Sequence, residues 1–168
     1  DDPVRFACSK LAHLHLATSN VYAENLKRLG EDEWRICFCG NPANTNTLDV
    51  PFLGLDKIAK MLDFDISDGR YLVFLKHPIS SEVSLSYHQM KVALEAVVRF
   101  SEVNKVKVVG IHPNSDPRSF ECLRAIDEFD GGSSVKFFHS LPRQIFVNLM
   151  RNAICLVGNS SMGILEAP

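Results

Sequence analysis

Short apolar runs alternate with longer segments of helical periodicity, and this alternation limits the folds open to the chain. Six runs are typical of buried strands: 13–18, 35–40, 71–76, 106–111, 135–138 and 154–157. Apolar residues at helical spacing predict helices over 20–29, 84–103, 120–129 and 142–152. Strands that alternate with helices predict an α/β fold in which a parallel sheet carries helices on both faces.

The composition is that of an ordinary globular protein. The 168 residues suffice for one domain or one and a half. With 46% hydrophobic residues, 23% charged residues and a net charge of −2, the chain is neither disordered nor a basic nucleic-acid binder. No apolar run approaches the length of a membrane span, and residues 1–5 do not resemble a signal peptide. We therefore expect a cytoplasmic protein with neither nucleic acid nor membrane as partner.

The five cysteines contain no C-x-x-C pair, which argues against a redox or zinc motif. Cys37 and Cys39 alternate on one expected strand, and Cys155 lies in another. We expect these thiols to be small buried side chains in a reducing compartment. His13 and His15 share one face of a strand without a third ligand at metal-site spacing, so we expect a structural role for them.

A polar segment with two prolines, residues 41–53, is the best candidate for a linker. A strand–helix–strand unit precedes it and a longer αβ series follows it. Near the other end of the chain, Pro168 interrupts a helix that has scarcely begun. These features favour an excised piece of a larger two-domain protein.

Polar residues follow three of the expected strands, where ligands bind in open parallel sheets. His77 follows 71–76, Asn114 and Asp116 follow 106–111, and Ser140 follows 135–138. A histidine at such a position can contact phosphate or transfer a proton. Each turn also has an ordinary interpretation, as a capped turn or the start of a helix.

The turn after residues 154–157 is the most informative. Gly158 permits a tight bend, and Asn159 and Ser160 are residues that commonly cap helices. The free N–H groups of a first helical turn favour an anion such as pyrophosphate. Glu166 lies one or two turns further on, where it could accept from a sugar hydroxyl. The alternative is a plain capped helix with a solvated glutamate.

Motifs along nearly the whole chain resemble the UDP-N-acetylglucosamine 2-epimerases, closest to the hydrolysing branch of sialic-acid biosynthesis. They are DDPVR at 1–5, SKLAHLH at 9–15, AENL at 23–26, GNP at 40–42, KHP at 76–78, PNSD at 113–116, SLPR at 140–143 and GNSSMGILE at 158–166. The resemblance implies the glycosyltransferase-B architecture, two Rossmann-like domains facing a cleft. Residues 1–49 would then be the C-terminal part of the first domain, and residues 50–168 the truncated, UDP-binding second domain.

The resemblance also implies a role for individual residues around the phosphates. His77 would contact the UDP phosphates near the reacting sugar and take part in catalysis. Ser160 and Ser161 would hold phosphate at a helix N-terminus. Asp1 matches a catalytic acid of the hydrolysing branch, although it is the first residue of this chain.

The remaining implied contacts are with the nucleoside. Asn114 and Asp116 would line the nucleotide pocket. Leu141 would bind uracil through its backbone, with Ser140 beside it, and Glu166 would accept from the ribose hydroxyls.

The implied reaction inverts C2 of UDP-N-acetylglucosamine by eliminating UDP to give 2-acetamidoglucal. Water addition yields N-acetylmannosamine, whereas addition of UDP yields UDP-N-acetylmannosamine, and neither outcome requires a metal or nicotinamide cofactor. A non-hydrolysing epimerase, an epimerase of a diacetamido UDP-sugar and a non-catalytic UDP-binding fragment remain alternatives. We expect this chain alone to be inactive and the full-length protein to form a homo-oligomer.

Overall fold

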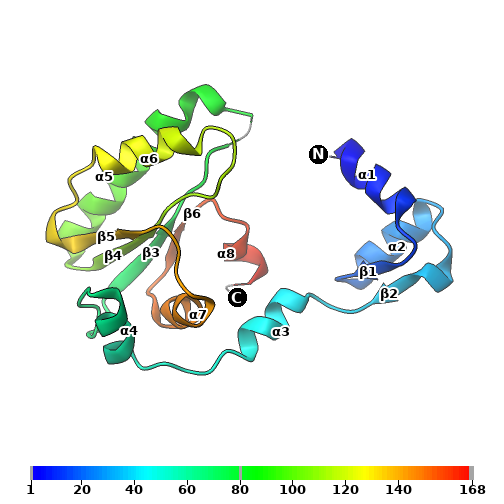
Figure 1. Cartoon of the computed structure of the whole chain (residues 1–168), viewed down its shortest axis with the longest axis horizontal. Helices are drawn as coiled ribbons and strands as arrows, with labels where there is room; N and C mark the ends of the chain where they lie inside the picture. The colour runs from blue at the N-terminus through cyan, green and yellow to red at the C-terminus, as the bar shows by residue number, and fades with distance from the viewer. Residues whose placement is uncertain (1, 80, 167–168) are drawn as a thin grey trace. The chain divides into compact units, whose positions relative to one another are not determined.

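In the computed structural model, which describes residues 2–79 and 81–166, the chain divides into two compact units, Asp1–Asp49 and Val50–Pro168 (Figure 1). The first unit contains α1 (Asp2–Leu11), β1 (His15–Ala17), α2 (Asn20–Arg28), β2 (Ile36–Phe38) and α3 (Pro42–Leu48). The second contains α4 (Leu55–Leu62), β3 (Tyr71–Leu75), α5 (Ser86–Asn104), β4 (Lys107–Ile111), α6 (Ser119–Asp127), β5 (Val135–Phe138), α7 (Arg143–Asn152), β6 (Leu156–Gly158) and α8 (Met162–Leu165).

A buried carboxylate organises the first unit, in which β1 and β2 form a parallel pair. The side chain of Glu31 is almost fully buried and receives Lys10 Nζ at 2.8 Å, His15 Nε2 at 3.0 Å and Arg35 Nη1 at 3.1 Å. The hydrogen bond from Lys10 is the main cause that lowers the pKa of Glu31. His15 therefore has the structural role expected from the sequence, because its partner is a buried carboxylate.

The second unit is built on four parallel strands in the order β5-β4-β3-β6. Alternate residues of β3 point to opposite faces of the sheet. Leu72 and Phe74 pack in one core cluster with α5 and α6, whereas Tyr71 and Val73 pack in another with α4 and α7. Helices thus cover both faces, and this explains why the sequence of β3 is continuously apolar.

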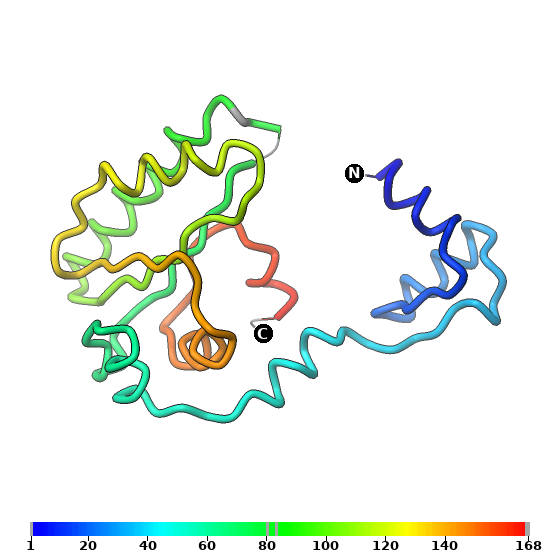
Figure 2. The backbone as a smooth tube through the Cα atoms, viewed as in Figure 1, coloured from blue at the N-terminus to red at the C-terminus, as the bar shows by residue number. Residues whose placement is uncertain are grey.

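The direction of the chain reverses at β3. From β3 the chain passes through α5 to β4 and through α6 to β5, and α7 then carries it back to β6 on the far side of β3 (Figure 2). Parallel sheets bind ligands beyond the carboxyl ends of the two strands between which such a reversal occurs. In this sheet those strands are β3 and β6.

The segment expected as a linker, 41–53, is ordered in both of its halves. The first half forms α3, because Asn41 accepts the N–H of Ala43 as its N-cap and Pro42 suits a first helical turn. The second half is tied to α7 by Asn148, which is fully buried. Asn148 Oδ1 accepts the N–H of Leu53 at 2.9 Å, and its Nδ2 donates to the carbonyl of Pro51 at 2.9 Å.

All six expected strands are confirmed, with ends that shift by a few residues. The expectation of buried thiols was wrong for three of the strand cysteines. Cys37, Cys39 and Cys155 are exposed, because β2 belongs to a two-stranded sheet and β6 is an edge strand. Cys122 of α6 is buried. Within the described residues, no helix has both the length and the apolar character needed to cross a bilayer.

Candidate functional site

His77 lies just beyond the end of β3, at the switch point of the sheet. Its backbone is held by the side-chain amide of Asn159, which follows β6. Asn159 Oδ1 accepts the N–H of His77 at 2.7 Å, and Asn159 Nδ2 donates to the carbonyl of His77 at 3.0 Å. The side chain of Asn159 therefore satisfies both the backbone N–H and the backbone C=O of His77, which lies 82 positions away in the sequence.

The imidazole of His77 is held from the other neighbouring strand. The backbone N–H of Asn114, which follows β4, donates to His77 Nδ1 at 3.2 Å. The side-chain amide of Asn114 in turn donates to Asp116 Oδ2 at 2.8 Å. Because Nδ1 accepts a hydrogen bond, the proton of the neutral ring resides on Nε2.

The surroundings of His77 favour the neutral imidazole. Burial is the main cause that lowers its pKa below the ordinary value of 6.5, and the nearby Lys76 acts in the same direction. The carboxylate of Asp116 opposes this shift. A neutral ring with its proton on Nε2 is a hydrogen-bond donor, the form suited to contact an anionic oxygen.

Two further histidines, which follow β4 and β5, form a pair. The Nδ1 atoms of His112 and His139 lie 2.8 Å apart, with the ring centroids at 4.1 Å in an edge-to-face arrangement. One ring must donate and the other accept, so the pair cannot be doubly protonated without breaking this hydrogen bond. Burial lowers the pKa of His112, and the charge of His139 lowers it further.

We expect the free energy of unfolding to fall as the pH drops from 7.5 to 5.5. His77 and His112 have lowered pKa values in the fold, so the unfolded chain binds more protons once the pH passes below about 6.5. The stability is therefore complete above this value and is lost as the pH falls towards the folded pKa values.

Urea unfolding at pH 7.5, 6.5 and 5.5 measures this loss. The carboxyl groups whose pKa values are lowered, such as Glu31 and Asp65, titrate below the chosen range. Substituting both His77→Asn and His112→Asn is expected to flatten the dependence. A slope that the double variant leaves unchanged would contradict the assignment.

The turn after β6 is shaped by Gly158. A Cβ atom at this position would lie 1.7 Å from the carbonyl oxygen of Leu75 in β3. Its backbone φ of +152° is also one that other residues rarely adopt. Beyond it lies a depression of about 760 Å³ whose lining includes Gly158, Asn159, Ser160 and Ser161.

The capping residues expected for the helix after β6 were wrong. Asn159 and Ser160 do not cap α8, which begins after Ser161 with no capping hydrogen bond from that side chain. The amide of Asn159 is engaged by His77 instead. The helix α6 begins after Arg118, which has a φ of +69°, and the side chain of Asp116 accepts from Asn114.

Three other predicted site residues lie close to the ends of strands or of α8. Ser140 is exposed in the loop after β5, and Leu141 beside it packs against the core cluster that contains α7. Glu166 is half-buried directly after α8. Asp1 lies outside the described residues. Sequence reasoning missed the amide of Asn159 as a partner of His77, and the pairing of His112 with His139.

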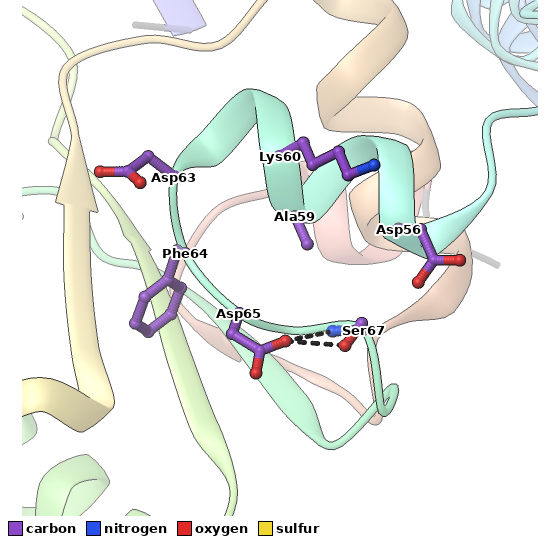
Figure 3. Close-up of a pocket in the computed structure, with 7 residues that line it drawn as sticks. All are labelled: Asp56, Ala59, Lys60, Asp63, Phe64, Asp65 and Ser67. Atoms are coloured by element: carbon purple, nitrogen blue, oxygen red, sulfur yellow. Dashed lines mark hydrogen bonds between the residues drawn. The ribbon is translucent and has the colours of Figure 1, made fainter.

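Another depression, of about 700 Å³, lies between α4 and the loop that precedes β3 (Figure 3). Its lining includes Asp56, Asp63 and Asp65 but a single basic residue, Lys60. Asp65 accepts hydrogen bonds from the N–H and the hydroxyl of Ser67, as Figure 3 shows. Lys136 lies 3.3 Å from the carboxylate of Asp63 and offsets part of this negative charge. The depression lies beside the loop that enters β3, and not at the carboxyl end of the strand where parallel sheets bind ligands.

Comparison with known proteins decides the family. The family model described as UDP-N-acetylglucosamine 2-epimerase matches residues 1–168. The chain belongs to the UDP-N-acetylglucosamine 2-epimerase family. This is a family of enzymes, and the resemblance stated from the sequence motifs is confirmed.

Among curated members of the UDP-N-acetylglucosamine 2-epimerase family, the chain is 28% identical over 170 residues to GDP/UDP-N,N'-diacetylbacillosamine 2-epimerase (hydrolyzing) of Campylobacter jejuni. It is 26% identical over 168 residues to UDP-N-acetylglucosamine 2-epimerase of Neisseria meningitidis serogroup B. Each alignment covers 100% of this chain and 43% of the relative. The chain thus spans less than half the length of these family members.

Solved structures of family members share the fold. The UDP-GlcNAc 2-epimerase of Methanocaldococcus jannaschii matches with a TM-score of 0.63 and 17% identity, over 92% of this chain and 43% of that one. The co-structure of S. aureus MnaA with UDP matches with a TM-score of 0.62 and 18% identity, over 93% and 39%. The expected fold class, α/β with parallel sheets of the glycosyltransferase-B type, is confirmed.

Proposed function

We propose that this chain is the UDP-binding portion of a hydrolysing UDP-N-acetylglucosamine 2-epimerase. The observation that carries the proposal is the placement of His77 at the switch point, held by groups from β4 and β6. This is where a parallel sheet binds a nucleotide. Residues 1–49 contribute the end of the first Rossmann-like domain, and residues 50–168 most of the second.

The geometry suits the departure of a diphosphate. Elimination of UDP breaks the C1–O bond of the sugar, and negative charge develops on the leaving oxygen. A neutral His77 donates a hydrogen bond through Nε2–H to that oxygen, which stabilises the charge as it forms. Ser160 and Ser161 line the adjoining depression and are placed to hold the phosphates.

The nucleoside contacts follow from the neighbouring loops. Asn114 and Asp116, which are hydrogen-bonded to each other beside His77, contact the nucleotide in this proposal. The backbone of Leu141 binds uracil, with Ser140 next to it. Glu166 accepts from the ribose hydroxyls. The general acids and bases that act on C2 belong to the first domain, and Asp1 is one of them. This chain alone is therefore expected to bind UDP without turning over the sugar.

We expect calorimetric titration to show that the chain binds UDP and that His77→Ala weakens binding about tenfold, the value of one charge-assisted hydrogen bond of roughly 1.4 kcal/mol. A matched control is His13→Ala, because His13 lies in the first unit, where its ring packs against Trp34. Its affinity is expected to equal that of the parent. The absence of binding in a folded sample would overturn the proposal.

A second candidate is an epimerase of a diacetamido UDP-sugar. It is favoured by the names of the two bacterial relatives that are 28% identical, both diacetylbacillosamine 2-epimerases of the hydrolysing type. The full-length protein, supplied with each UDP-sugar in turn, separates the two by the rate at which UDP is released. Detection of free N-acetylmannosamine rather than its UDP derivative distinguishes the hydrolysing outcome.

A further inference from the structure

We infer that Asn159 is a positioning residue for His77, an inference that rests on the proposed function. The side-chain amide of Asn159 fixes the backbone of His77, and this places the imidazole where Asn114 selects the protonated nitrogen. Asn159 acts through His77 and not through a contact of its own with the ligand.

The first step is the geometry of the amide. An asparagine side chain has one acceptor and two donor hydrogens, and here Oδ1 and Nδ2 face the N–H and the C=O of the same residue. Because the amide accepts one of these hydrogen bonds and donates the other, only one orientation of the amide satisfies both. A rotated amide would place two donors or two acceptors against each other.

The second step is the consequence for the ring. The pairing of β3 with β6 ends at Leu75, so backbone pairing between these strands does not hold His77. The Asn159 amide continues the link between the two strands as far as His77, two residues beyond Leu75, because it substitutes for a strand backbone. The imidazole then lies within 3.2 Å of the Asn114 N–H, and the ring has a single tautomer with its proton on Nε2.

The third step is that both polar atoms of the amide are engaged by His77. A single N–H of Nδ2 is left over, and the orientation of the amide is already set by the two bonds to His77. Ser160 and Ser161 carry the hydroxyl groups of this turn. The loss of the Asn159 side chain is therefore expected to weaken UDP binding only to the extent that His77 contributes to that binding.

A thermodynamic cycle on UDP binding tests the inference in this chain. Asn159→Ala is expected to weaken UDP binding about tenfold in the parent. In a His77→Ala background the same substitution is expected to change affinity by less than about twofold, because the residue through which it acts is gone. Equal weakening in both backgrounds would overturn the inference.

The state of the ring gives a readout that does not depend on UDP. In protein labelled with ¹⁵N-histidine, His77 is expected to show an acceptor-type Nδ1 and a protonated Nε2 at pH 7.5. Asn159→Ala is expected to replace this single tautomer by exchange between the two. Retention of the tautomer would overturn the inference, even if UDP binding failed and the proposed function with it.

Two further variants keep the test decisive. Asn159→Asp retains the acceptor for the His77 N–H but loses the donor, so it is expected to show the same loss of tautomer if the alanine variant does not fold. Asn104→Ala removes an exposed amide at the end of α5 that bonds the carbonyl of Phe100. This control is expected to leave both the tautomer and the affinity unchanged.

Discussion

Replacing Gly158 by alanine is expected to destabilise the second unit by about 3 kcal/mol or more, from steric overlap and backbone strain together. The added Cβ would lie 1.7 Å from the carbonyl oxygen of Leu75, which is backbone and cannot rotate away. Relief requires β6 to separate from β3. Urea unfolding followed by circular dichroism measures the loss, and calorimetry is expected to show that UDP binding disappears with it.

Gly54→Ala is the matched control for this substitution. Gly54 has a φ of −66°, and no atom lies within 4 Å of a Cβ built on it. We expect its effect on stability to stay below about 1 kcal/mol. An equal effect of the two glycine substitutions would show that the close approach of β6 to β3 does not determine the result.

The second large effect is expected for Asn148→Ala, at about 3 kcal/mol of lost stability. The substitution leaves the buried Leu53 N–H unpaired, which costs roughly 1–3 kcal/mol, and it also removes the partner of the part-buried Pro51 carbonyl. The segment before α4 would then detach from α7. Hydrogen exchange at the Leu53 amide and urea unfolding of the chain both measure this.

Asn152→Ala provides the comparison, because it also removes a side-chain amide from α7. Asn152 Nδ2 donates to the carbonyl of Asn148 within the same helix, and among residues 2–79 and 81–166 it has no recorded hydrogen bond to a second segment. Its loss is expected to cost less than about 1 kcal/mol. If the two substitutions proved equal, the buried position of Asn148 would not be the cause of its effect.

The strands could be predicted because they are buried on both faces. A run such as Tyr71–Leu75 is apolar throughout, and few other structures suit it. The helices α1, α3 and α4 were not predicted from the sequence, for reasons that differ between them. The polar helix α3 has no periodic apolar face. In α1 a short set of apolar residues does recur at helical spacing, at Val4, Ala7, Cys8 and Leu11, but none of them is buried. In α4 the buried residues Ile58 and Leu62 do recur at helical spacing, but the helix is only eight residues long.

The site could be predicted in part. The polar residues after each strand indicate the edge of the sheet at which the candidate site lies, because every parallel strand ends there. No local sequence pattern predicts the order β5-β4-β3-β6, because the order depends on which strands pair. Without that order, Asn114 and Asn159 cannot be recognised as the residues on either side of His77. For this reason Asn159 was interpreted as a helix cap.

The strand order also sets a sequence of events in folding. Strands β3, β4 and β5 are joined by local crossovers, so they can associate before the last strand arrives. The Asn159 bond closes a loop of more than eighty residues, and closing such a loop is slow. The amide proton of His77 is protected only once β6 has docked. Its rate of exchange with solvent therefore reports the opening of this edge, and the proposed nucleotide site would form and break with that motion.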